Sequence, residues 1–170
     1  MPTLPRLLVL MVLLFSVSFA YAGQKIAFVN QAKLLQKAPQ AESARNKLQK
    51  EFAKRDKSLV KLQKQIKSNA IKLQKDAAIL SAGELNKLKR KITLLRRDLE
   101  RDKAAFKEDL SIRQNEELVK LQKAVLKSIQ TIAKNEKYDL IISDGVIYAS
   151  KQIDITDKIL AQLKKQYSGR

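Results

Sequence analysis

The 170-residue chain contains no cysteine, no histidine and no tryptophan. The lack of cysteine excludes disulfide bonds and thiol redox chemistry. The lack of histidine removes the commonest general base and the commonest zinc ligand. The chain also has no glycine-rich phosphate loop of the Walker type. We therefore expect neither enzyme activity nor a bound metal or cofactor.

One group of carboxylates near the C-terminus could in principle supply an acid–base pair. Its members are Asp139, Asp144, Asp154 and Asp157. A structural interpretation explains them better, because Asp144-Gly145 is typical of a two-residue hairpin turn. Either Asp154 or Thr156 is expected to cap a helix. Little is then left for catalysis, and no catalytic residue is predicted.

Proline is absent between Pro39 and Gly145, and Gly83 is the single glycine between them. Apolar residues recur three and four positions apart on both sides of Gly83, which is the spacing of one helix face. The outgoing stripe is Leu48, Phe52, Leu59, Leu62, Ile66, Ala70, Leu73, Ala77 and Leu80. The returning stripe is Leu85, Leu88, Ile92, Leu95, Leu99, Phe106, Leu110, Leu118, Leu121, Val125, Ile129 and Ile132. Residues 41–137 are therefore predicted to form a helical hairpin with arms on the order of 60 Å long.

The turn of this hairpin is predicted near residues 81–84, with Gly83 as its hinge. Ser81 and Glu84 have the spacing of a capping box, which starts a helix. Arg55, Asp102 and Arg113 interrupt the apolar stripes. We expect these breaks to leave apolar surface on the arm incompletely covered, and such surface binds many partners weakly.

The first 22 residues have the pattern of a secretory signal peptide. Arg6 precedes an apolar run from Leu7 to Phe15, and Ala20-Tyr21-Ala22 is a small-x-small cleavage pattern. The alternative, a membrane anchor, fits less well because the run is shorter than the roughly 20 residues that a span needs. The mature chain is thus expected to begin at Gly23 and to be exported.

Residues 23–40 and 138–170 are predicted to form a small β-containing body. The segment Lys25–Asn30 has the pattern of a strand that is buried on both faces. Residues 138–143 and 146–149 flank Asp144-Gly145 and predict a β-hairpin, followed by a short helix with an apolar stripe from Ile155 to Leu163. The residues expected in the body core are Ile26, Phe28, Leu140, Ile141, Ile142, Val146 and Ile147.

These two segments are too short to build a core unaided, and cysteine and histidine are absent, so other chains must complete it. The fold predicted from the residues is mainly α. Long helical hairpins project from a β body that several subunits share. The number of subunits does not follow from the sequence.

The predicted arm carries most of the positive charge. The whole chain has 35 basic and 17 acidic residues, and residues 41–137 hold 26 and 13 of them. An excess of this size indicates an acidic partner attracted at long range. The candidate contacts, which face only Asp76 and Glu84 near the turn, are Lys72, Lys75, Lys87, Lys89, Arg90, Lys91, Arg96 and Arg97.

Three kinds of acidic partner suit a basic helical rod: nucleic acid, an anionic membrane surface, and acidic or unfolded polypeptide. Nucleic acid is disfavoured because the chain is exported and its few aromatic residues do not alternate with the basic ones. Lipid headgroups could bind the cluster from Lys87 to Lys91. Unfolded polypeptide would use both the charge and the exposed apolar residues.

The order of these features resembles the Skp (OmpH-like) family of periplasmic chaperones. The resemblance is carried by the signal peptide, by Lys25–Asn30 (KIAFVN), by the basic hairpin, and by Tyr138–Ala149 with Asp154–Leu160. It implies a homotrimer with a β-barrel-like body and three helical tentacles. It also implies an ATP-independent holdase in the periplasm that keeps unfolded outer-membrane β-barrel proteins from aggregating. Lipopolysaccharide is a further anionic partner that the resemblance suggests for basic arm residues.

Overall fold

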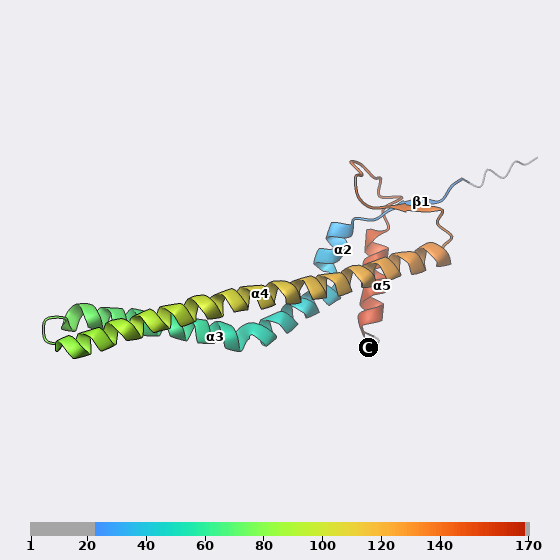
Figure 1. Ribbon diagram of the computed structural model, residues 1–170. Coiled ribbons are helices and arrows are strands. Elements are labelled where there is room, and N and C mark those ends of the chain that lie inside the picture. Colours follow the sequence, from blue (N-terminus) through green and yellow to red (C-terminus); the bar gives the residue numbers. More distant parts are fainter. Residues whose placement is uncertain (1–22, 169–170) are drawn as a thin grey trace, which may run out of the picture.

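The computed structural model describes residues 23–168, so the predicted signal peptide lies outside the described part of the chain. The elements occur in the order β1 (Ile26–Phe28), α2 (Gln31–Lys37), α3 (Pro39–Asp76), α4 (Ala82–Asn135), β2 (Leu140–Ile142) and α5 (Thr156–Ser168). Helices α3 and α4 form a long arm, and the remaining elements gather at its base (Figure 1). The molecule is mainly helical with a small two-stranded sheet, as the sequence predicts.

Helix ends follow the local chemistry of the sequence. Pro39 occupies the first turn of α3, where its missing N–H costs nothing. The Ser81 side chain accepts from the Glu84 N–H while the Glu84 carboxylate accepts from the Ser81 N–H, so the predicted capping box is confirmed. The predicted hinge at Gly83 is wrong. Because the capping box starts α4 directly after Ser81, Gly83 lies in its first turn and the chain turns over residues 77–81.

The apolar stripes of the two arm helices mostly face each other. Phe52 and Ile92 are buried, and Leu59, Leu62 and Leu95 are half-buried. Each helix has only one neighbour along most of its length, so few side chains reach full burial. Leu118 departs from the prediction, because it is exposed on α4 while its neighbour Leu121 points inward.

The body is built around β1. This strand pairs in parallel with β2, with Ile26 opposite Leu140 and Phe28 opposite Ile142. The pairing is parallel because the whole arm is inserted between the two strands. On its other edge, β1 bonds to the segment before α5: the Phe28 N–H donates to the Ile153 carbonyl over 2.8 Å.

A small core holds the body together. Its fully buried members come from β1, α2 and α5, which pack against the base of α4. They include Ala27, Leu34, Ile159 and Leu163. The Thr156 hydroxyl, itself buried, accepts from the Asn30 N–H over 2.9 Å and ties the start of α5 to the end of β1.

Two strand predictions are corrected. The β-hairpin is wrong: the Asp144-Gly145 turn forms, with Gly145 at φ 76°, but residues 146–149 are not a strand. A three-residue strand has too few ladder bonds to hold a second one without further packing. The segment Lys25–Asn30 is also not buried on both faces, because Ile26 is exposed and Phe28 half-buried while Ala27 is covered.

Candidate functional site

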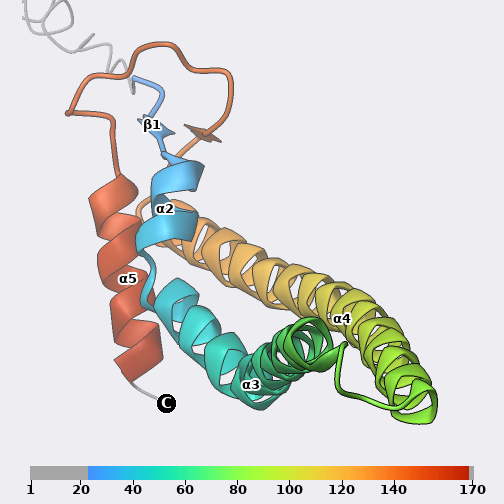
Figure 2. The same ribbon diagram turned by 90° about the vertical axis from the view of Figure 1, so that its left-hand side faces the viewer.

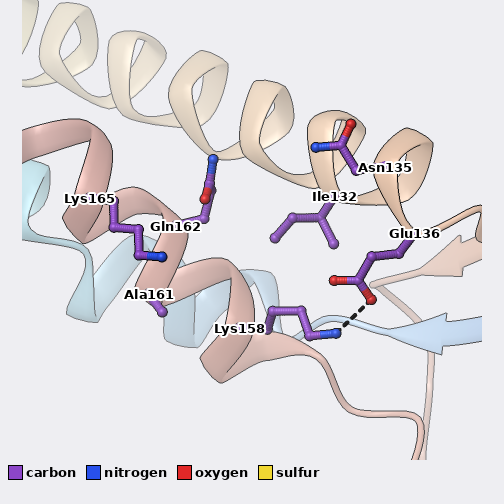
Figure 3. Close-up of a pocket in the computed structure, with 7 residues that line it drawn as sticks. All are labelled: Ile132, Asn135, Glu136, Lys158, Ala161, Gln162 and Lys165. Atoms are coloured by element: carbon purple, nitrogen blue, oxygen red, sulfur yellow. Dashed lines mark hydrogen bonds and ion pairs between the residues drawn. The ribbon is translucent and has the colours of Figure 1, made fainter.

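The hollows of the described surface are shallow, and one of them lies between α4 and α5 (Figure 3). It measures about 240 Å³ and is lined by Ile132, Glu136 and Lys158 among others. The Lys158 ammonium donates to the Glu136 carboxylate over 2.6 Å, which raises the pKa of Lys158 and lowers that of Glu136. This pair joins the two helices, so the hollow has the character of a structural junction.

Residues 23–168 contain no group of three or more potential metal-ligating side chains. In the same residues, no helix is long and apolar enough to cross a membrane.

The predicted basic residues lie on the distal half of the arm. Lys72 and Lys75 are on α3, and the other six are on α4, where Figure 1 shows the arm leading away from the body. All eight are exposed. None of the eight forms an ion pair within the described residues, so their charges are free to meet a partner.

Glu84 is less available as a counter-charge than the sequence suggests. Its carboxylate binds both the hydroxyl and the N–H of Ser81. The hydroxyl bond is the main cause that lowers the pKa of Glu84. The arm tip is therefore a surface of unpaired cations.

The tip also carries an apolar feature that the sequence reasoning missed. Ile79 is 82% exposed in the loop that joins α3 to α4. Ile79 follows the last turn of α3, so the heptad spacing of the helix does not predict that its side chain is exposed. An uncharged loop, residues 77–81, thus stands at the far end of the arm between clusters of lysine and arginine.

Further apolar side chains on the arm lie outside the predicted stripes and are exposed. They are Val60 and Ile71 on α3, and Leu94, Ile112, Val119 and Leu126 on α4. The single apolar stripe predicted for each helix does not include these residues. These side chains supply the exposed apolar surface that was expected at the stripe interruptions.

Two of the three interruptions, Arg55 and Arg113, are closed, contrary to the prediction. The Arg55 guanidinium binds the Asp109 carboxylate over 2.7 Å, from one helix to the other. Arg55 also lies over the rings of Phe52 and Phe106, at 5.6 and 5.8 Å from their centres. The two rings meet edge to face with centres 5.5 Å apart. A charged residue here fills the gap between the helices.

Arg113 closes the second interruption in the same way. Its guanidinium binds Glu51 of α3 over 3.1 Å and Glu117 of its own helix over 3.3 Å. Lys47 of α3 binds Glu117 over 3.2 Å. Hydrogen bonds to Glu51, the larger cause, and to Glu116 raise the pKa of Arg113 further above its usual range. At the third interruption, Asp102 pairs with Arg101 on its own helix.

The cross-arm carboxylate Glu117 makes the arm sensitive to acid. A hydrogen bond from Lys120, with Lys47 contributing, lowers the pKa of Glu117 below the ordinary 4.5. A lowered folded-state pKa gives stability that is present above the unfolded value and is lost as pH falls through the folded one. We therefore expect the urea midpoint of helix unfolding to drop between about pH 5 and pH 3.

A Glu117→Gln variant is the control for this prediction. It should have a lower midpoint at neutral pH and a smaller drop on acidification, since the titrating group is gone. Circular dichroism at 222 nm follows both proteins. An identical drop in the variant would show that Glu117 does not contribute.

The predicted body residues divide into two groups. Ile141 is half-buried and packs on the core, and Phe28 and Val146 are half-buried. The others, Ile26, Leu140, Ile142 and Ile147, are exposed. Ile147 and its neighbour Tyr148 have relative exposures of 104% and 83%. The outer edge of β2 has no strand beside it within the described residues. The body therefore presents an apolar, partly unpaired surface.

These features define a class of protein: a small body bearing a long two-helix arm, whose functional groups are exposed apolar and cationic side chains instead of an enclosed site. The model of one family, described as "Outer membrane protein (OmpH-like)", matches residues 25–163. The chain belongs to this OmpH-like family.

Curated relatives extend the match over nearly the whole chain. The Skp chaperone protein of Pectobacterium atrosepticum is 31% identical over 84% of this chain and 87% of its own length. The Skp chaperone protein of Photorhabdus laumondii is 31% identical over 89% of this chain and 92% of its own length. The Skp chaperone protein of Escherichia coli is 29% identical over 85% of this chain and 89% of its own length.

A solved structure supports the fold independently. An OmpH-like protein of Caulobacter crescentus superimposes with a TM-score of 0.73 at 13% identity, over 85% of this chain and 86% of its own. The relatives are chaperones, not enzymes.

Proposed function

We propose that this protein is an ATP-independent holdase of the periplasm that binds unfolded outer-membrane β-barrel proteins and prevents their aggregation before they reach the outer membrane. The observation that carries the proposal is the surface of the arm. Exposed apolar side chains such as Val60, Ile71 and Leu94 share that surface with cations that have no ion-pair partner among the described residues. The predicted signal peptide and the chaperone relatives support the compartment and the activity.

This surface suits an unfolded β-barrel. Such a client exposes alternating apolar residues that pair edge to edge and aggregate. Scattered apolar contacts on a long arm bind it weakly at each point but strongly in sum. Each contact exchanges quickly, so the client is released without a nucleotide cycle.

The protein acts as a homo-oligomer, and the family resemblance suggests a trimer. Residues 23–40 and 138–170 form the shared body, and 41–137 the arm. The exposed Ile26, Leu140, Ile142 and Ile147 support this assignment, because a body of this size with so much apolar surface is incomplete alone.

Dilution of an unfolded client tests the function. An outer-membrane β-barrel protein in urea is diluted into buffer with and without the mature protein, and light scattering is recorded. We expect scattering to be suppressed at an equimolar ratio of oligomer to client without ATP, while folded soluble proteins are not bound. Undiminished aggregation, with tight binding to duplex DNA at physiological salt, would favour a nucleic-acid partner.

The tip supports a second candidate, binding to an anionic membrane surface such as phospholipid or lipopolysaccharide. Ile79 stands exposed between Lys75 and Lys87, the arrangement of a side chain that enters a lipid interface beside cations. The chain has no tryptophan, so Ile79→Trp provides a single fluorophore. A blue shift with phosphatidylglycerol vesicles and none with phosphatidylcholine vesicles would establish this binding.

Charge reversal at the tip separates the effect of long-range electrostatic attraction on association from the effect of apolar contacts on dissociation. A variant with Lys87→Glu, Lys89→Glu, Arg90→Glu and Lys91→Glu leaves the inward Leu88 and Ile92 unchanged, so the arm should still fold. Long-range attraction acts on encounter and is screened over about 8 Å at physiological salt. Association with an acidic client should slow severalfold, with a deficit that shrinks as salt rises, while dissociation changes less.

The matched control reverses four other exposed lysines, at Lys50, Lys54, Lys57 and Lys61 on α3. It changes the net charge equally but leaves the tip intact. Stopped-flow fluorescence compares the two variants. Equal slowing would assign the effect to net charge, and no slowing in either would leave the arm charge as an aid to solubility.

A further inference from the structure

The base of α4 carries a second line of apolar residues that faces away from the inward stripe. Ile112, Val119 and Leu126 are seven residues apart and are 50%, 45% and 55% exposed. Asn115 and Gln122, both exposed, stand three positions after the first two, while Ile129 belongs to the inward stripe and packs against the body core. Spacings of three and four give the pattern of a coiled-coil seam. We call five residues the outer seam: Ile112, Asn115, Val119, Gln122 and Leu126.

The outer seam is distinct from the contact that α4 makes with the rest of its own chain. Inward residues of the same stretch, such as Leu121, Val125 and Ile132, are buried against α3, α5 and the body. At 100° per residue, the outer seam lies roughly 120° around the helix from that inward stripe. Two apolar faces are typical of a helix that packs between two partners, and one partner is already present.

The surface over the outer seam is hollowed. A groove of about 410 Å³ is lined by Val119, Gln122, Leu126 and Ile129, with Gln31 of α2 at its margin. Lys123 borders it on the α4 side. The groove is open, and within the described residues no other element covers it.

The two amides of the outer seam indicate the kind of partner that fits. A side-chain amide both donates and accepts, so Asn115 can pair with Asn115 of an identical helix, and Gln122 with Gln122. A purely apolar partner would bury these amides without hydrogen bonds, which is costly. A single polar residue in a seam also fixes the register between like helices. The seam therefore matches a second copy of itself.

The position of the outer seam agrees with this partner. Figure 2 shows α4 passing behind α2 and leading away from it on the side opposite α5. Leu140 and Ile142 are exposed on β2, whose outer edge has no strand beside it within the described residues. A contact between copies at the body can continue along the base of the arm.

We propose that the outer seam, from Ile112 to Leu126, packs in parallel and in register against the same seam of a second copy of this chain. This contact adds to the assembly through the body in the proposed function and does not replace it. It holds the bases of the arms together. Their distal halves, which include residues 82–105 of α4, remain apart.

Single-cysteine variants test the contact directly, because the chain has no cysteine of its own. Gln122→Cys lies in the outer seam, and Lys127→Cys is the control on a third, exposed face of α4. In the full mature oligomer, mild oxidation should link Gln122→Cys chains into covalent dimers at least tenfold faster than Lys127→Cys chains. Equal rates, in samples that light scattering shows to be assembled, would overturn the proposal.

A second variant separates assembly from client binding. Val119→Lys with Leu126→Lys places charges in the outer seam, and Val60→Lys with Leu94→Lys is the control at exposed apolar sites elsewhere on the arm. The seam variant should raise the protein concentration at half dissociation at least tenfold, and the control should not. A seam variant that stays assembled but no longer protects a client would show the seam to be a client surface and overturn the proposal. Loss of the proposed function would instead appear as failure of the unmodified oligomer to suppress aggregation.

Discussion

An Ile159→Asp variant should fail to fold its body. Ile159 is fully buried in α5, among the core residues from β1 and α2. The substitution removes the apolar contacts of a large side chain and places a carboxylate there without a partner. A cost of about 5 kcal/mol or more is expected, against a typical total stability of about 5–15 kcal/mol. Oligomer and chaperone activity should be lost together.

Ile159→Val is the matched control, and it should cost only about 1 kcal/mol because it removes one methylene. Size-exclusion chromatography with light scattering and urea unfolding compare the two variants. A folded, assembled Ile159→Asp protein would mean that α5 is not part of the body core.

A variant with Ile147→Asp and Tyr148→Asp should separate folding from assembly. Both side chains are exposed in the single chain, so helix content and unfolding of the isolated chain should be unchanged. In a body shared between chains, the two carboxylates would lie in an apolar interface without partners. The dissociation constant of the oligomer should rise roughly hundredfold, or about 2.7 kcal/mol. Suppression of client aggregation should fall with it.

Ile147→Leu with Tyr148→Phe is the control, because it keeps the apolar surface at both positions. Sedimentation across a dilution series gives the dissociation constants. If the aspartate variant assembles normally, the segment after Gly145 is not part of the interface and the body is shared through other residues.

The long elements of this fold can be read from the sequence because their causes are local. The stripe spacing, the absence of proline and the Ser81–Glu84 box all act within a few residues, and α3 and α4 follow from them. The same holds for α5, whose apolar stripe from Ile155 to Leu163 is buried as the spacing predicts.

What the sequence did not reveal depends on residues that are distant in the chain. Arg55 and Arg113 read as breaks in a stripe, because their partners Asp109 and Glu51 lie on the opposite helix. The strand predicted at residues 146–149 has the right composition, but a single chain offers it no ladder to join. The outer seam is not predicted from the sequence because one apolar stripe per helix is enough to explain the hairpin.

The cross-arm ion pairs are confined to the lower part of the arm. Glu51–Arg113, Lys47–Glu117 and Arg55–Asp109 join α3 to α4, and towards the tip from Arg55 no further ion pair links the two helices in the described structure. Local opening is easiest where few interactions must break. Backbone amides between residues 57 and 105 should therefore exchange with deuterium sooner than those near Arg113. The stiffness of the arm is therefore graded: the part near the body is rigid, and the tip is flexible.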